Sequence, residues 1–147
     1  MSAVEQIDRP ALGQVRSLCP LIQVYDMNEA VAFYRERLGF EVVAQSDERD
    51  TPEGRLFHWC WLRLGGAHLM LNTAFDEGER PSARDPARQQ AHADTCFYFD
   101  APDVDGVAAA LRSKELPFEG PRDASYGMRQ LWLSDPDGYQ LCFQTRV

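Results

Sequence analysis

The pattern of hydrophobic and polar positions repeats once along the chain. In each copy, an apolar strand-like run leads into an acidic helix cap, an amphipathic helix and further strand-like runs. The two caps are Asp26 and Asp103, which lie 77 positions apart (103 − 26), the same separation as Cys19 and Cys96. A repeat of this length predicts a duplicated unit of one strand, one helix and two or three more strands.

The repeat divides the chain into two modules and two connecting parts. We expect an α+β fold with modules at residues 18–73 and 94–147, each with a sheet whose one face is covered by its helix. Residues 1–17 are interpreted as an N-terminal arm. Residues 74–93 are rich in charge and proline and are interpreted as a solvated linker or as a lid over a binding site.

Alternation within the predicted strands assigns side chains to two faces of each sheet. One face is aliphatic or carries Phe, and we expect the helices to cover it. The other face mixes thiols, imidazole, amides and aromatic rings, and we expect it to line a cavity between the modules. The candidate ligand-binding residues on this mixed face are Gln23, Trp59, Trp61, Arg63, Met70, Asn72, Tyr98, Gln130, Trp132 and Gln144. Core packing or a dimer contact is the alternative role for the tryptophans.

Charge and hydropathy narrow the classes of partner. The 147 residues include 23 Asp and Glu against 15 Lys and Arg, a net charge of −8. Such a chain, with no segregated basic patch, is not expected to bind nucleic acid or an anionic membrane surface. The longest apolar runs fall short of the roughly 18 residues that span a bilayer, and the start does not resemble a secretory signal. We therefore expect a cytoplasmic protein that binds a small molecule or another protein.

The motifs of the two modules resemble those of the vicinal oxygen chelate superfamily, which includes glyoxalase I, bleomycin-resistance proteins and ring-cleaving dioxygenases. The matching motifs are Val24-Tyr25-Asp26, Ala32-Phe33-Tyr34, Leu38-Gly39-Phe40, Asp103-Val104-Asp105 and Asp135-Pro136-Asp137-Gly138-Tyr139. The resemblance covers roughly residues 18–146. It implies two tandem βαβββ modules whose curved mixed sheets surround a cleft, helices on the outer faces, and a homodimer.

The resemblance also implies four positions at which many superfamily members hold a divalent metal. These positions are occupied here by Cys19, His68, Cys96 and Cys142; the family pattern uses His, Glu or Gln, and of the four only His68 is of such a type. Three thiols and one imidazole suit a closed structural zinc site better than an open catalytic one. We expect no metal cofactor, with zinc as the alternative, and buried unreactive thiols as the simplest role for the cysteines.

Three hypotheses about function follow. The first is a protein that binds a small, partly aromatic organic molecule in the cleft without a catalytic metal. The second is a metal-dependent glyoxalase-type lyase, isomerase or transferase that uses His68 as ligand or general base; the alternative role for His68 is a hydrogen-bonded histidine that lines the cleft wall. The third is a purely structural dimerisation module. If residues 74–93 form a lid, Arg84 or Arg88 is the candidate to bind an anionic ligand.

Overall fold

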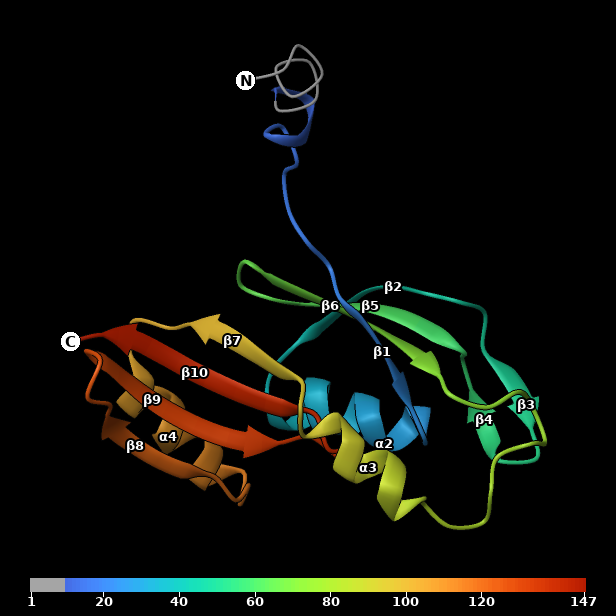
Figure 1. Cartoon of the computed structure of the whole chain (residues 1–147). Helices are drawn as coiled ribbons and strands as arrows, with labels where there is room; N and C mark the ends of the chain where they lie inside the picture. Colours follow the sequence, from blue (N-terminus) through green and yellow to red (C-terminus); the bar gives the residue numbers. More distant parts are fainter. Residues whose placement is uncertain (1–9) are drawn as a thin grey trace.

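Two four-stranded sheets, each covered on one face by helix, make up the body of the molecule (Figure 1). The computed structural model of the chain describes residues 10–147. The first sheet has the order β1-β6-β5-β2 and the second the order β7-β10-β9-β8. The strands are β1 (Leu21–Val24), β2 (Glu41–Gln45), β5 (Trp59–Leu64), β6 (Ala67–Thr73), β7 (Cys96–Asp100), β8 (Glu119–Asp123), β9 (Met128–Ser134) and β10 (Gln140–Arg146).

The two sheets have the same topology, which confirms the duplicated α+β architecture expected from the sequence. In each, the first strand of the module pairs in parallel with the last, β1 with β6 and β7 with β10, while the remaining pairs are antiparallel. A short hairpin of β3 (Arg49–Thr51) and β4 (Gly54–Leu56) extends from the first module. The strand β8 was not specifically predicted, because its Glu-Gly-Pro sequence is typical of a loop.

The helices begin where the sequence indicates. Asp26 accepts a hydrogen bond from the Glu29 N–H at 3.1 Å and starts α2 (Met27–Val31), which continues as the π-helical segment η1 (Ala32–Arg37). Asp103 likewise accepts a hydrogen bond from the Gly106 N–H at 2.9 Å and starts α4 (Val104–Ser113). The 77-residue spacing of the two caps therefore corresponds to two equivalent helix N-termini.

The predicted division of strand residues between the two faces is confirmed in both sheets. Ile22, Val24, Leu69 and Leu71 are buried on the helix-covered face of the first sheet. The corresponding residues of the second sheet are Leu131, Leu133, Leu141 and Phe143. These side chains form one hydrophobic cluster with helical residues of both modules, so the two units share a core.

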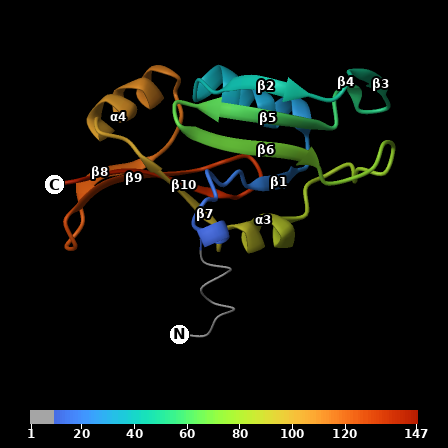
Figure 2. The same cartoon turned by 90° about the horizontal axis from the view of Figure 1, so that it is seen from above.

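The connection between the modules is more ordered than its composition indicates. It contains α3 (Pro86–His92), which begins after Asp85, with a proline in the first turn as is common at helix starts. Figure 2 shows α3 beside β1 and β7, at the junction of the two modules. The segment expected to be a solvated linker or a lid thus packs against both modules.

The described part of the N-terminal arm leaves the body at the start of β1 and extends away from both sheets (Figure 1). Leu12, Val15 and Leu18 are all exposed in this segment. Residues 1–9 of the predicted arm lie outside the described residues. Between residues 10 and 147, no helix is both long enough and apolar enough to cross a membrane.

Candidate functional site

A cleft separates the two modules where the hairpin of β5 and β6 approaches the edge strand β7. Its two adjoining hollows, of about 290 Å³ and about 720 Å³, share Gly66, Ala67, Tyr98 and Phe99. Volumes of this order are those of small-molecule sites. The smaller hollow is also lined by Leu18, Pro20, His68, Leu69, Cys96 and Phe97. His68 and Tyr98, two of the candidates from the sequence, therefore line the same cleft from different modules.

On the first module, the orientation of His68 on β6 is fixed by Trp61, its diagonal neighbour on β5. The Trp61 indole N–H donates a hydrogen bond to His68 Nδ1 at 3.0 Å, and the two rings meet edge to face at 5.7 Å between centroids. Because an indole nitrogen only donates, Nδ1 must be the accepting nitrogen of the imidazole. The neutral ring then carries its proton on Nε2, and this N–H is the group that His68 offers to a ligand.

On the second module, Tyr98 and Trp132 enclose Cys142. The three residues lie side by side on β7, β10 and β9, and the two aromatic rings meet edge to face at 5.5 Å. Cys142 has no exposed surface, and burial raises the pKa of its thiol to about 11. The thiol is therefore protonated at neutral pH, and the surface presented beside the cleft is aromatic.

Two amides continue this surface toward the end of the second sheet. Gln130 is buried, its Oε1 accepts a hydrogen bond from the Tyr126 hydroxyl at 2.7 Å, and its Nε2 donates to Gln144 Oε1 at 3.0 Å. These contacts hold the amides in a single orientation. Among residues 10–147 the Gln144 amide nitrogen has no acceptor, so it can donate toward the open face.

The remaining candidates of the first module lie on the open face of its sheet, outside the lining of the cleft. Gln23, Asn72 and Trp59 form one row across β1, β6 and β5, and Met70 pairs with Trp61 in the next row. The Arg63 side chain forms an ion pair with Glu41 at 3.3 Å. In Figure 2 the first sheet is seen nearly face-on and the second nearly edge-on, so the two open faces are steeply inclined to each other.

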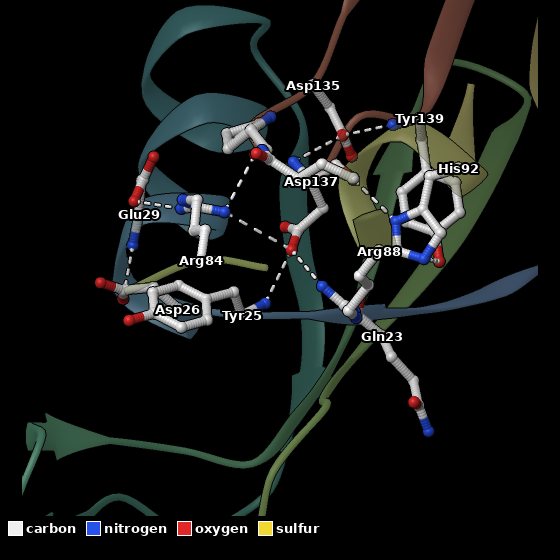
Figure 3. A network of polar contacts seen from close by, with 12 residues as sticks. Gln23, Tyr25, Asp26, Glu29, Arg84, Arg88, His92, Asp135, Asp137 and Tyr139 are labelled. Atoms are coloured by element: carbon white, nitrogen blue, oxygen red, sulfur yellow. Dashed lines mark hydrogen bonds and ion pairs between the residues drawn. The ribbon is translucent and has the colours of Figure 1, made fainter. Parts of the chain in front are cut away.

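A charged network centred on the buried Asp137 ties the modules together (Figure 3). Asp137 is 1% exposed, and its Oδ1 accepts hydrogen bonds from the Tyr25 N–H at 2.8 Å and from Arg88 at 3.1 Å. Arg88 also donates to the Gln23 carbonyl at 2.7 Å, and Arg84 donates to the Pro136 carbonyl at 2.9 Å and pairs with Glu29. The expectation that Arg84 or Arg88 would bind an anionic ligand is thus wrong, because both guanidinium groups are engaged inside the chain.

A second carboxyl of the same turn lies deeper in the core. Asp135 Oδ1 accepts the backbone N–H groups of Asp137 and Tyr139, both at 2.9 Å, and Oδ2 accepts the Tyr34 hydroxyl at 2.6 Å. Burial is the main cause that raises the pKa of Asp135 to about 6; the hydrogen bond from Tyr34 opposes this effect, and the neighbouring Asp137 charge adds to it. Tyr34 comes from η1, so this contact also joins the two modules.

The comparisons with known proteins agree with this architecture. A model of the Glyoxalase/Bleomycin resistance protein/Dioxygenase superfamily matches residues 12–143, which is most of the chain. The chain belongs to this superfamily. No curated protein sequence gives a significant match.

Solved structures of superfamily proteins resemble this chain along nearly its whole length. An antibiotic binding protein from Streptomyces sp. CB03234 is 24% identical, with a TM-score of 0.64, over 91% of this chain and 98% of that protein. A bleomycin-binding protein complexed with bleomycin is 18% identical, with a TM-score of 0.66 over 90% and 100%. Lactoylglutathione lyase from Agrobacterium tumefaciens is 22% identical, with a TM-score of 0.61 over 88% and 93%. At these identities the similarity establishes the fold.

The residues at the superfamily's metal-binding positions do not fit a catalytic divalent metal. Within residues 10–147, no three side chains of His, Cys, Asp or Glu are grouped so as to hold an ion, and Cys19, His68, Cys96 and Cys142 are therefore not gathered into one site. Burial raises the pKa of the Cys19, Cys96 and Cys142 thiols, which opposes the thiolate form that a metal requires. His68 Nδ1 already accepts the Trp61 N–H, so the nitrogen left over carries a proton.

The residues that link the modules cannot be recognised from local sequence patterns. Asp137 and Tyr34 stand out in the sequence only as members of motifs, and Arg88 only as a candidate to bind an anionic ligand. The one local indication was the Asp-Pro-Asp-Gly turn, which combines two carboxylates with a tight turn in a chain that has a basic connecting segment. Their partners are 49 to 112 positions distant, beyond the range of any local pattern.

Proposed function

We propose that this protein binds a small, partly aromatic organic molecule in the cleft between its modules and uses no catalytic metal. The observation that carries the proposal is the Trp61–His68 hydrogen bond at 3.0 Å, with His68 in the same hollow as Tyr98. This arrangement offers one fixed N–H donor beside aromatic surface. Sites that orient a largely apolar ligand with a few placed polar groups have this composition.

The chemistry of the walls favours binding over catalysis. A general base needs a free lone pair, and a nucleophile needs an activated anion. The remaining imidazole nitrogen of His68 carries a proton, and the nearby thiols of Cys96 and Cys142 have raised pKa values. The antibiotic binding and bleomycin-binding proteins of similar fold agree with a binding role.

The proposal includes a homodimer in which a second copy covers the open faces. Leu21, Trp61 and Tyr98 are 46%, 36% and 55% exposed on these faces, and apolar side chains gathered on one exposed face are typical of an interaction surface. Because the open faces of one chain are inclined rather than opposed, a second copy is needed to enclose a ligand between them. Light scattering of the purified protein should give twice the mass of one chain; a monomer at micromolar concentration would contradict this part.

Binding is tested with 2-naphthol as the aromatic probe, followed by calorimetry and by backbone NMR shifts. We expect saturable binding with shifts at residues 66–69 and 96–99. Tyr98→Ala and His68→Ala should each weaken binding about tenfold. The first removes an aromatic wall of the cleft, and the second removes the N–H donor. His58→Ala, a histidine outside the cleft, is the matched control and should leave affinity unchanged.

The metalloenzyme alternative is tested in the same preparation. Ni²⁺, Zn²⁺ and Mn²⁺ are added singly, and the melting temperature and lactoylglutathione lyase activity are measured. If the proposal is right, the metals change neither the melting temperature nor the lyase activity. A rise in melting temperature that disappears in His68→Ala, together with lyase activity, would replace the binding function by an enzymatic one.

A further inference from the structure

A bulge in the edge strand β8 places two opposite charges on one face of the second sheet. Glu119 pairs with Trp132 and Arg122 pairs with Gln130, so three steps along β8 correspond to two steps along β9. Residues three apart in a regular strand point to opposite faces. The extra residue therefore brings both Glu119 and Arg122 to the open face that carries Trp132.

Gly120 makes this bulge possible. Its φ is +93°, which L side chains rarely adopt, and a Cβ at this position would lie 2.7 Å from the Gln130 carbonyl oxygen. Only glycine permits so close an approach of the two strands. Gly120 therefore permits the bulge that brings Glu119 and Arg122 to one face.

The two charges line a hollow of about 440 Å³ with an aromatic wall. The hollow lies where the start of β8, the end of β9 and the start of β10 meet. Its lining residues are Pro117, Phe118, Glu119, Arg122, Trp132, Leu133, Ser134 and Gln140. The edge-to-face contact of Trp132 with Tyr98 connects this hollow to the wall of the cleft.

Neither charge is neutralised by the part of the chain that the structure describes. Glu119 and Arg122 form no ion pair with each other or with another residue between positions 10 and 147. By contrast, Arg129 on the helix-covered side of the same sheet is neutralised, because it pairs with Asp105 at 2.8 Å and with Asp123 at 3.0 Å. Arg122 and Glu119 thus retain their full capacity to bind a charged group.

We propose that this hollow binds the charged end of a small zwitterion with an apolar or aromatic body, of which an aromatic α-amino acid is the simplest form. Arg122 binds the carboxylate, Glu119 binds the ammonium group, and Trp132 with Phe118 contacts the body. The proposal rests on the proposed function, because it assigns a ligand class to the second-module part of the same open face.

A zwitterion satisfies this pair of charges better than a simple ion does. A purely anionic ligand would pair with Arg122 but bring its charge next to Glu119, and a purely cationic ligand would do the reverse. The net charge of −8 further disfavours an anion. Guanidinium groups bind carboxylates through two parallel hydrogen bonds, which also fixes the orientation of the ligand.

The test uses three probes of one shape: L-phenylalanine, 3-phenylpropanoate, which has no ammonium group, and phenethylamine, which has no carboxylate. Affinity is measured by calorimetry on the full chain, and the site is located by backbone NMR shifts. We expect L-phenylalanine to bind about tenfold more tightly than either analogue, with shifts at residues 117–122, 132–134 and 140. Equal affinity for all three, or shifts elsewhere, would overturn the proposal.

Two variants assign the roles of the charges. Arg122→Gln should weaken L-phenylalanine and 3-phenylpropanoate about tenfold but not phenethylamine, and Glu119→Gln should weaken L-phenylalanine and phenethylamine but not 3-phenylpropanoate. Arg146→Gln, an exposed arginine at the opposite end of the sheet, is the control and should change nothing. Uniform weakening of all probes by either variant would contradict charge recognition.

The outcomes separate this inference from the proposed function. If 2-naphthol binds in the cleft and L-phenylalanine shows no dependence on its two charges, only the present inference fails. If L-phenylalanine binds as described while 2-naphthol and the Tyr98→Ala and His68→Ala variants show no effect, the cleft proposal fails and the hollow beside Trp132 is the binding site.

Discussion

Arg88 of α3 lies 3.1 Å from Asp137 of the turn before β10 and uses its second nitrogen to bind the Gln23 carbonyl of β1 at 2.7 Å. One side chain therefore bridges the connecting segment, the second module and the edge of the first sheet. The same carboxylate accepts the Tyr25 N–H, which is the next outward-pointing group of that edge. This charge pair therefore links the two modules directly.

Asp137→Asn should destabilise the protein by about 3 kcal/mol, because it leaves two arginines facing an uncharged group in a buried site. Urea unfolding followed by circular dichroism measures this loss. Asp94→Asn, which changes an exposed carboxylate just before β7, is the control and should have little effect. Equal stability of the Asp137 variant and the wild type would show that the bridge does not contribute to folding.

The buried Asp135 should give the protein an unusual pH dependence. Its folded pKa, about 6, is above the ordinary value of 3.8, so between these values the folded state binds more protons than the unfolded state. The contribution of Asp135 to stability is therefore present below about pH 4 and declines by about 3 kcal/mol as pH rises through 6. The unfolding free energy of the wild type minus that of Asp135→Asn, measured from pH 4 to 7, should show this decline.

Tyr34→Phe tests the effect of the Tyr34 hydroxyl on the pKa of Asp135. The Tyr34 hydroxyl bond lowers the pKa of Asp135, so its removal should raise that pKa further and move the decline to higher pH. An unchanged midpoint would mean that Tyr34 and Asp135 are not coupled.

The four thiols should differ in reactivity according to burial. Cys60 and Cys142 are fully buried, and burial raises the pKa of each thiol to about 11, so both should resist a disulfide reagent such as DTNB until the protein unfolds. Cys19 and Cys96 are only partly buried and should react first. Trp132→Ala should make Cys142 reactive without affecting Cys60; protection of Cys142 in this variant would contradict the enclosure described above.

Gly138 and Gly127 form a matched pair for the packing of α3. Both have φ values near +85°, but a Cβ at Gly138 would lie 2.3 Å from the Gln89 carbonyl oxygen, whereas nothing lies within 4 Å of one at Gly127. Gly127→Ala should cost about 1–2 kcal/mol from backbone strain alone. Gly138→Ala should cost more and should speed hydrogen exchange in residues 86–92. Similar costs for the two variants would show that α3 is not held against the turn.

Local patterns predict much of this fold and little of its tertiary polar chemistry. The alternation that separates Ile22 and Val24 from Leu21 and Gln23, and the equivalent caps Asp26 and Asp103, are properties of single elements and are visible in the sequence. The strand β8 escapes specific prediction because its bulge requires Gly120 in a conformation that ordinarily indicates a turn. The engagement of Arg84 and Arg88, and the orientation of His68 by Trp61, depend on partners that only the tertiary structure brings near.

The contacts of Arg88 and Asp137 with β1 have a consequence for the behaviour of the protein at high concentration. An uncovered outer strand offers unpaired backbone groups on which strands of other molecules can add, the first step of ordered aggregation. Here the outward carbonyl of Gln23 and the outward N–H of Tyr25 are already occupied by side chains from the other half of the molecule. The contacts that join the two modules therefore also block the addition of another strand at this part of the β1 edge.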